Sequence, residues 1–204
     1  PHTETVLDTR TDEQLLSAYR TGEAGALEPL IRRHHDDLMR FLYHLTGNRS
    51  IAEDVFQETF LQIHLSSGTF DASRRFKPWL FTIAANKARD VLRKNARRRT
   101  LDLDAPVGGD GDQGTFVDLM QMQGPGPAQS VNTSERDAMV QQAVSEMPLL
   151  LREILLLGYF QKMSYSQIAD ALNIPLGTVK SRLHAAVASF AKKWESVSKE
   201  KSQR

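Results

Sequence analysis

Hydrophobic residues in the first hundred positions recur at spacings of three and four, which places their side chains on one face of an α-helix. One such pattern covers residues 27–45 and ends at Gly47. A second opens at Ser50, which with Glu53 forms the sequence signature of a capping box. A third begins near Pro78, a residue suited to a first helical turn. No strand-like alternation competes with these patterns, so this part of the chain is predicted to be all-α.

A second group of helical patterns occupies the C-terminal third. A helix is expected from about residue 135 to 146, and the apolar residues 149–160 must be largely buried. Ser164 with Gln167 predicts another capped helix, which ends at residue 172, and a longer helix follows from residue 176 to about 194. This is the spacing of a helix-turn-helix. Three residues agree with the usual pattern of this motif: Ala169 is small where the two helices cross, Asn173 suits the turn, and Val179 can anchor the second helix inward.

The segment between the two groups has a different composition. Residues 101–133 contain no Lys or Arg, five Asp and six Gly, together with Pro106, Pro125 and Pro127. Such a composition is typical of a flexible acidic linker. The chain is therefore predicted to hold two small helical domains, residues 1–100 and 134–204, joined by the linker 101–133.

Charge is segregated along the chain although the formal net charge is only +1. Residues 71–100 hold ten Lys or Arg against two Asp or Glu, whereas residues 1–70 hold six against eleven. The absence of cysteine excludes a disulfide framework and thiolate chemistry. No apolar run is long enough for a membrane span and no secretory signal precedes the helices, so a soluble cytoplasmic protein is expected.

Two surfaces carry candidate nucleic-acid contacts. In a helix-turn-helix, the start of the second helix faces the major groove. The residues expected there are Thr178, Lys180, Ser181, Arg182 and His184. The third helix of the first domain carries an outward basic stripe, Asn86, Arg89, Arg93 and Arg97. Just before this stripe, aromatic and cationic residues are interleaved, as suits stacking on unpaired bases: Phe70, Arg74, Arg75, Phe76, Lys77 and Trp79. The alternative is that Phe76, Trp79 and Phe81 belong to the hydrophobic core.

A third candidate surface is acidic. Asp54, Gln57, Glu58 and Leu61 fall on one continuous stripe of the helix that follows Ser50. Such a stripe suits a basic protein surface, although by itself it equally fits a solvated helix side with one exposed leucine.

No catalytic or metal-binding constellation is evident. His34, His35, Asp36 and Asp37 are adjacent in sequence, and adjacent residues of a helix point to different sides. His34 lies on the apolar face and is interpreted as a packed core histidine. We therefore expect neither a metal nor another cofactor, and no enzymatic activity.

Three sequence blocks resemble the bacterial RNA polymerase sigma factors of the extracytoplasmic-function (ECF) type. The blocks are residues 52–60 (AEDVFQETF), residues 76–86 (FKPWLFTIAAN), and residues 164–169 (SYSQIA) followed by 177–183 (GTVKSRL). The resemblance implies that the first domain is sigma region 2, which binds core RNA polymerase and recognises and opens the −10 promoter element. It implies that the second is region 4, which reads the −35 element. It assigns polymerase binding to the acidic stripe at residues 54–61. It assigns contacts with the −10 element to the aromatic, cationic and polar residues named above between Phe70 and Arg97. The family is commonly held inactive by an anti-sigma partner, and a free monomer is expected.

The sequence departs from the family pattern in two places. Ala185, Ala186 and Ala188 follow His184, where a basic residue is common, which predicts a weaker −35 contact or one that depends more on DNA shape. Pro29 falls where the family pattern is helical, so the helix is expected to begin or bend there.

Two other functions are compatible with the residues. A stand-alone helix-turn-helix regulator would bind palindromic duplex DNA as a dimer without polymerase. A small helical nucleic-acid enzyme would depend on the histidine and aspartate residues 34–37.

Overall fold

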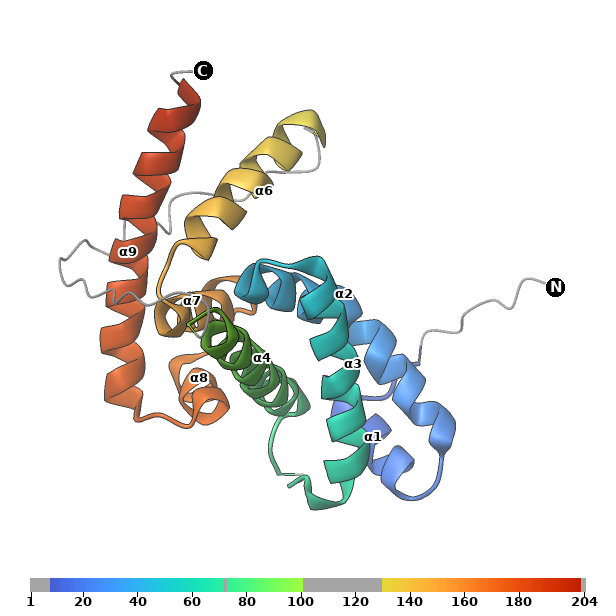
Figure 1. Cartoon of the computed structure of the whole chain (residues 1–204). Helices are drawn as coiled ribbons and strands as arrows, with labels where there is room; N and C mark the ends of the chain where they lie inside the picture. Colours follow the sequence, from blue (N-terminus) through green and yellow to red (C-terminus); the bar gives the residue numbers. More distant parts are fainter. Residues whose placement is uncertain (1–7, 72, 101–129, 203–204) are drawn as a thin grey trace.

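The computed structural model describes residues 8–71, 73–100 and 130–202, and these residues form helices and turns with no β-strand among them (Figure 1). The helices in chain order are α1 (Asp12–Arg20), α2 (Leu27–Thr46), α3 (Arg49–Ser66), α4 (Phe76–Thr100), α6 (Ser130–Ser145), α7 (Leu149–Leu155), α8 (Tyr165–Leu172) and α9 (Leu176–Ser202). The expected all-α class is confirmed. Residues 101–129 of the expected linker lie outside the described residues, and its last four belong to α6, which begins five residues earlier than expected.

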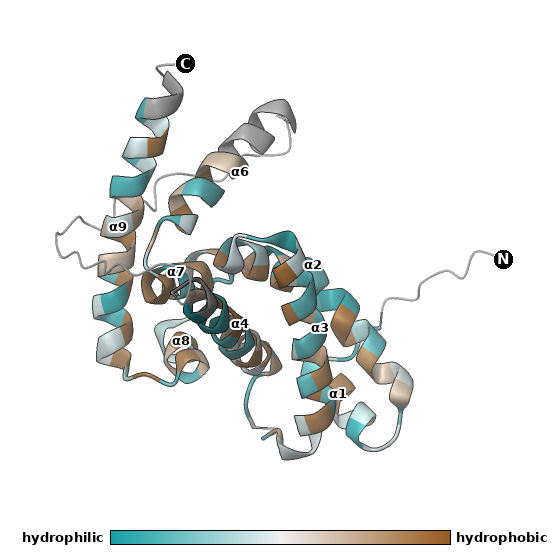
Figure 2. Ribbon diagram, in the orientation of Figure 1, coloured by the Kyte–Doolittle hydropathy of each residue, from teal (hydrophilic) through white to brown (hydrophobic). Residues whose placement is uncertain are grey.

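Helices α2, α3 and α4 pack together because each buries the apolar stripe predicted for it. The fully or nearly fully buried members are Leu30, Leu38, Phe41, Leu42, Leu45, Ala52, Val55, Ile63, Leu80, Ala84 and Ala88. Figure 2 shows that the helix ribbons alternate between hydrophobic and hydrophilic stretches, as expected of helices that bury one face. Pro29 lies in the first turn of α2. Backbone N–H groups in a first turn have no acceptor within the helix, so the missing N–H of proline removes no helical hydrogen bond.

The junction of α2 and α3 corrects one prediction. Gly47 ends α2, as its sequence position predicted, and it adopts the left-handed conformation, with φ of 70°. The residue that caps α3 is Asn48 rather than Ser50: its side-chain oxygen accepts a hydrogen bond from the backbone N–H of Ile51 at 3.0 Å. Ser50 lies inside the first turn of the helix. Asn48 and Ser50 are both good capping residues, and sequence spacing alone did not separate them.

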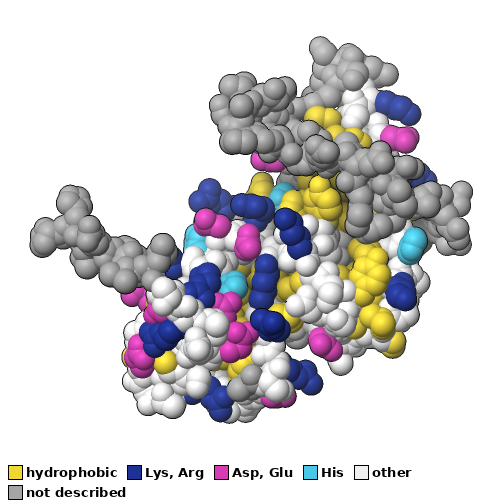
Figure 3. All heavy atoms as spheres, turned by 180° about the vertical axis from the view of Figure 1, so that it is seen from behind, with side chains coloured by type: hydrophobic (Ala, Val, Ile, Leu, Met, Phe, Trp, Pro, Cys, Tyr) yellow, Lys and Arg dark blue, Asp and Glu magenta, His cyan; other side chains and the backbone are white. Residues whose placement is uncertain are grey.

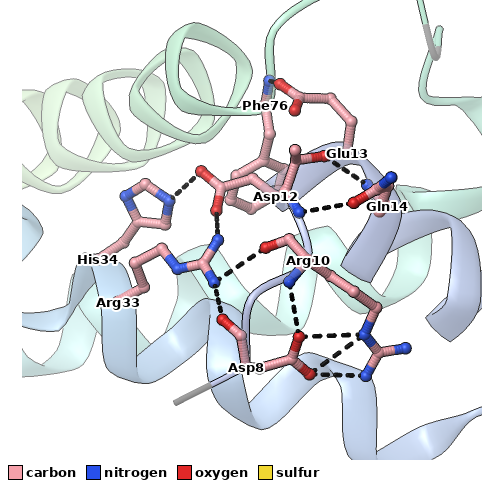
Figure 4. A network of polar contacts seen from close by, with 9 residues as sticks. Asp8, Arg10, Asp12, Glu13, Gln14, Arg33, His34 and Phe76 are labelled. Atoms are coloured by element: carbon pink, nitrogen blue, oxygen red, sulfur yellow. Dashed lines mark hydrogen bonds and ion pairs between the residues drawn. The ribbon is translucent and has the colours of Figure 1, made fainter.

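Helix α1 was not predicted from the sequence, although it begins with a complete capping box between Thr11 and Gln14. Two acidic residues of its first turn attach it to the other helices (Figure 4). Asp12 accepts a hydrogen bond from Nε2 of His34 at 2.7 Å, and Glu13 accepts one from the backbone N–H of Phe76 at 3.0 Å. Glu13 thus satisfies a free N–H group at the beginning of α4 from a distant part of the chain.

The C-terminal part is built around the predicted helix-turn-helix. Ser164 and Gln167 form the expected capping box of α8. Asn173 ends α8 in the left-handed conformation, with φ of 52° and ψ of 51°. Val179 is fully buried and holds the beginning of α9 against the other helices. The apolar segment before α8 forms α7 and a π-helical turn (Leu156–Phe160). Its middle, residues 153–157, is buried, whereas Leu150 and Tyr159 are exposed, so the segment is less buried than expected.

The two parts pack against each other, with α4 beside α8 and α2 beside α6 and α7. Polar contacts also cross this junction. Arg152 Nη1 donates to the backbone oxygen of Leu45 at 2.8 Å, Gln161 Nε2 donates to that of Asp37 at 3.2 Å, and His44 is hydrogen-bonded to Gln141. Among the described residues, no helix combines the length and apolar composition that a membrane span requires.

Candidate functional site

Helix α3 presents the predicted acidic stripe to solvent. Asp54, Gln57, Glu58 and Leu61 are all exposed, and 52% of Leu61 is accessible. Leu65, one turn further along, is 69% accessible and extends the stripe. An exposed surface that combines carboxylates with two leucines suits a partner with cations around an apolar contact. The sequence interpretation did not include Leu65, although its spacing of four from Leu61 was visible.

Helix α4 contributes one cation to the edge of this stripe. Lys87 Nζ lies 3.5 Å from Oε2 of Glu58, an exposed ion pair between two helices. Such pairs contribute little stability, about 0–1 kcal/mol. The ion pair therefore leaves Glu58 available to a stronger cationic partner. The role of Lys87 as a neighbour of Glu58 was not visible in the sequence because it depends on how α3 and α4 pack.

The aromatic residues before and within α4 correct a second prediction. Phe70 is 6% exposed and Phe76 is fully buried, so neither presents a face on which a base could stack. The rings of Phe70 and Trp79 lie 4.7 Å apart, and Phe76 lies 5.4 Å from the ring of His34. Trp79 is partly buried at the edge of this cluster. The core interpretation therefore holds for Phe76 and Phe81, and Phe70 joins them because its ring packs against those of Phe76 and Trp79.

The cations of the same segment remain accessible. Arg74 and Arg75 are exposed, and Arg74 is paired with Asp71 only at 3.6 Å. Hydrogen bonds from Ser73 hold the pKa of Asp71 below its usual value. Lys77 is half-buried: its Nζ lies 3.7 Å from Asp37 and 5.8 Å from the centre of the Phe81 ring.

The outward stripe of α4 is divided in two. Asn86, Arg93 and Arg97 are exposed, as expected of a nucleic-acid contact. Arg89 is only 19% accessible, because its Nε donates to Oε1 of Glu153 on α7 at 2.9 Å. The contact of this stripe with a carboxylate of the C-terminal part was not predicted, because it depends on how α4 and α7 pack.

The beginning of α9 presents the predicted helix-turn-helix contacts. Lys180, Ser181 and His184 are exposed, and Thr178 and Arg182 are partly buried. A Cβ added at Gly177 would meet no atom within 4 Å, so the surface before these residues is open. On the face of the molecule opposite to that in Figure 1, positive and negative side chains are interspersed (Figure 3), so this face is not uniformly basic.

The histidines of α2 do not form a site. His34 is 6% exposed and bonded to Asp12, whereas His35 is exposed, bonded to Asp36, and packed edge-on against Phe56. In the described part of the chain, no three His, Asp or Glu side chains converge as ligands of a metal ion.

The fold and these surfaces define a class of protein: a two-part helical protein with an exposed acidic stripe in one part and a helix-turn-helix in the other. Models of two families match the chain, sigma-70 region 2 over residues 30–98 and sigma-70 region 4 over residues 137–189. The chain is 32% identical over 166 residues to the ECF RNA polymerase sigma factor SigW of Bacillus subtilis, covering 81% of this chain and 87% of SigW. It is 33% identical over 180 residues to the ECF sigma factor SigL of Mycobacterium tuberculosis, covering 86% and 92%. This chain belongs to the ECF sigma factor family, whose members are specificity subunits of transcription initiation and not enzymes.

Two solved structures share the fold at 21% sequence identity. One is CnrH in complex with the cytosolic domain of CnrY, with a TM-score of 0.65 over 92% of this chain and 99% of CnrH. The other is the sigma factor RpoE of Bartonella quintana in complex with the anti-sigma factor NepR, with a TM-score of 0.62 over 83% and 96%. The likeness supports the helical architecture on both sides of the undescribed segment.

Proposed function

We propose that this sigma factor binds core RNA polymerase through the acidic stripe of α3 and directs it, in the bacterial cytoplasm, to promoters with −35 and −10 elements. The observation that carries the proposal is the simultaneous exposure of Asp54, Gln57, Glu58 and Leu61 on one helix face of a family member. The matching positions of the family bind the clamp helices of the largest polymerase subunit. The exposed Leu65 extends the contact by one helical turn.

Recognition of the −10 element is assigned to the exposed polar and cationic residues next to and on α4. Arg74 and Arg75 precede the helix, and Asn86, Arg93 and Arg97 lie on its outer side. The partly buried Trp79 is the one aromatic residue of the predicted set with an accessible edge, and Phe70 and Phe76 support the site from the core. Extrusion of a base requires a few kcal/mol, which these polar contacts would offset when the strand is opened.

Recognition of the −35 element is assigned to α9. Lys180, Ser181 and His184 reach base edges, while Thr178 and Arg182 contact phosphates beside the groove. The sequence of alanines after His184 limits the number of cationic contacts, so a modest salt dependence is expected.

Regulation by an anti-sigma factor is the second part of the proposal. The solved structure of RpoE contains its anti-sigma factor NepR, and this chain shares the fold of that sigma factor. An inhibitor that covers the α3 stripe and the DNA-binding helices would block both functions, and the free sigma factor would be a monomer.

Co-elution with bacterial core RNA polymerase on a sizing column tests polymerase binding. We expect the wild-type protein to co-elute at moderate salt, and Glu58→Lys to reduce the bound fraction at least tenfold. Glu28→Lys is the matched control, because Glu28 is an exposed helical glutamate on α2, away from the stripe. Leu61→Asp provides an independent loss at the apolar end of the stripe.

The outcomes separate the proposal from its competitors. Circular dichroism must show that each variant keeps its helical content. If Glu58→Lys and Leu61→Asp bind polymerase as well as Glu28→Lys does, the assignment of the stripe is wrong. If the folded wild type binds no polymerase but does bind palindromic duplex DNA as a dimer, the stand-alone regulator is the correct function.

A further inference from the structure

Lys87 lies where the acidic stripe of α3 meets the helix assigned to −10 DNA. Its Nζ donates to Oε2 of Glu58 at 3.5 Å, and the accessible fractions of the two side chains are 32% and 57%. Glu58 belongs to the stripe proposed to bind polymerase, whereas Lys87 directly follows Asn86, which is proposed to contact the −10 strand. One ion pair therefore joins the polymerase-binding surface to the DNA-binding helix.

The cations of α4 differ in what they contact. Arg93, Lys94 and Arg97 are exposed and, in the part of the chain that the structure describes, form no ion pair. Lys87, by contrast, is paired with a carboxylate of the stripe. A DNA phosphate can reach the first three directly, whereas it has to compete with Glu58 for Lys87.

Helical geometry places Lys87 at the border between two sides of α4. Successive residues of an α-helix are rotated by about 100°, and residues seven apart lie on nearly the same side. Asn86 and Arg93 thus share the outer side of the helix, while Lys87 and Lys94 share the side next to it, toward α3. The long, flexible side chain of a lysine can turn from one side to the other.

The ion pair is weak enough to be exchanged. Exposed pairs of lysine and glutamate add little net stability, because water solvates both groups well when they are apart. A cation of a partner protein that meets Glu58 inside an interface is screened less by water and salt, so its attraction to Glu58 is stronger. The same cation repels the ammonium group of Lys87. Exchange of the internal cation for the external one is therefore favoured.

We propose that polymerase binding transfers Lys87 from Glu58 to the phosphate backbone of the −10 DNA, so that this lysine couples the two activities of region 2. The proposal rests on the proposed function, because it requires polymerase on the α3 stripe and DNA along α4. In the free protein Lys87 competes with polymerase for Glu58, and in the polymerase complex it is an additional cation for phosphate. Since such coupling is reciprocal, DNA bound to Lys87 also strengthens polymerase binding.

Competition for core RNA polymerase is the first test. The tracer is wild-type sigma factor with a dye on Lys199→Cys, an exposed position near the end of α9 in a chain without native cysteine. Unlabelled Lys87→Gln should displace the tracer at a concentration about two- to fivefold lower than wild type, because it lacks the internal competitor.

Lys94→Gln is the matched control for this measurement. It removes the same charge from the same side of α4, about 10 Å along the helix, where salt screens most of its effect on Glu58. It should therefore displace the tracer as wild type does. If Lys87→Gln displaces the tracer no better than Lys94→Gln, the competition is overturned.

A double-mutant cycle shows whether the gain acts through Glu58. Glu58→Gln keeps the size of the side chain and should bind polymerase more weakly than wild type. When Lys87→Gln is added to Glu58→Gln, no further gain is expected, because the carboxylate for which Lys87 competes is absent. An equal gain in both backgrounds would show a general charge effect and overturn the proposal. Circular dichroism checks that every variant is folded.

The salt dependence of DNA binding is the second test. The probe is a fluorescein-labelled DNA with a single-stranded tail, selected from a random pool for binding to the wild-type polymerase complex. Each phosphate contact contributes about 0.7–0.9 to the slope of log binding constant against log salt concentration. With core polymerase saturated by each variant, Lys87→Gln should make this slope shallower by that amount. Lys87→Arg, which keeps a cation, should preserve the wild-type slope.

The remaining outcomes separate this proposal from the proposed function. Lys192→Gln removes an exposed cation of α9 and should leave the slope unchanged. Equal slopes for wild type and Lys87→Gln would show that Lys87 does not reach phosphate, which overturns the transfer. A failure of the proposed function looks different, because then the unlabelled wild type displaces no tracer, or no DNA is selected by its complex with polymerase.

Discussion

Replacement of Phe76 by alanine distinguishes a core residue from a base-stacking residue. Phe76 is fully buried at the first position of α4, among the rings of His34, Phe70 and Trp79 at centroid distances of 5.4, 6.5 and 6.0 Å. Truncation would leave a cavity between these rings and remove their contacts. Removal of a buried phenylalanine side chain reduces the free energy of unfolding by about 3–5 kcal/mol.

Urea unfolding followed by circular dichroism measures this loss, and the slope of the transition should stay the same. Phe76→Leu keeps most of the volume and should lose only about 1–1.5 kcal/mol. Asn86→Ala is the matched functional variant: Asn86 is exposed on the same helix, so stability should change by no more than about 0.5 kcal/mol. Its effect should instead be seen as reduced permanganate reactivity of the −10 thymines in the polymerase complex.

A stacking role for Phe76 makes the opposite prediction. In that case Phe76→Ala would leave the unfolding transition within about 0.5 kcal/mol of wild type and reduce promoter opening as strongly as Asn86→Ala. That pair of results would refute the conclusion that the ring belongs to the core.

Two further predictions concern stability. Asn48→Ala should reduce the free energy of unfolding by about 1 kcal/mol through loss of the α3 cap, whereas Ser50→Ala should have almost no effect; equal losses in urea unfolding would contradict the cap assignment. Burial lowers the pKa of His44 below its usual 6.5, although Gln141 and other neighbours oppose part of this shift. Since the unfolded chain then binds the proton first, stability should be full above pH 6.5 and fall as the pH drops below it. His44→Gln should flatten this part of the profile of urea midpoint against pH, and an unchanged slope would exclude His44 as its source.

Local signals in the sequence predicted the helical architecture well. The helix end at Gly47, the left-handed Asn173 and the capping box at Ser164 depend on residues within one helical turn, and all of them form as expected. The apolar stripes of α2, α3 and α4 were equally local, because helical periodicity alone determines which side chains share a face. Periodicity could not indicate what the exposed residues bind. The resemblance to the sigma factor family indicated their expected partners.

The errors and omissions arose from contacts between distant segments. Phe76 follows two cations, and only the packing of α1 and α2 shows that its ring is covered. Glu153 lies in an apolar segment where a single acid is unremarkable until α4 brings Arg89 beside it. Helix α1 carried a recognisable Thr11 and Gln14 signature, but with nine residues it is short for an isolated helix and depends on Asp12 and Glu13 to attach it.

The segment before α4 is fixed at both ends before any DNA arrives. Arg20 of α1 donates to the backbone oxygens of Phe70 and Gly68, each at 3.2 Å, and Glu13 of the same helix holds the N–H of Phe76. Fixing the backbone of one residue requires about 1–2 kcal/mol of conformational entropy. Because folding of α1 has already restricted the ends of this segment, Arg74 and Arg75, if they make the proposed −10 contact, would bind a DNA strand with a smaller entropic loss than a free loop would incur. On the proposed function, α1 would thus influence the affinity for promoter DNA although it carries none of the residues proposed to contact it.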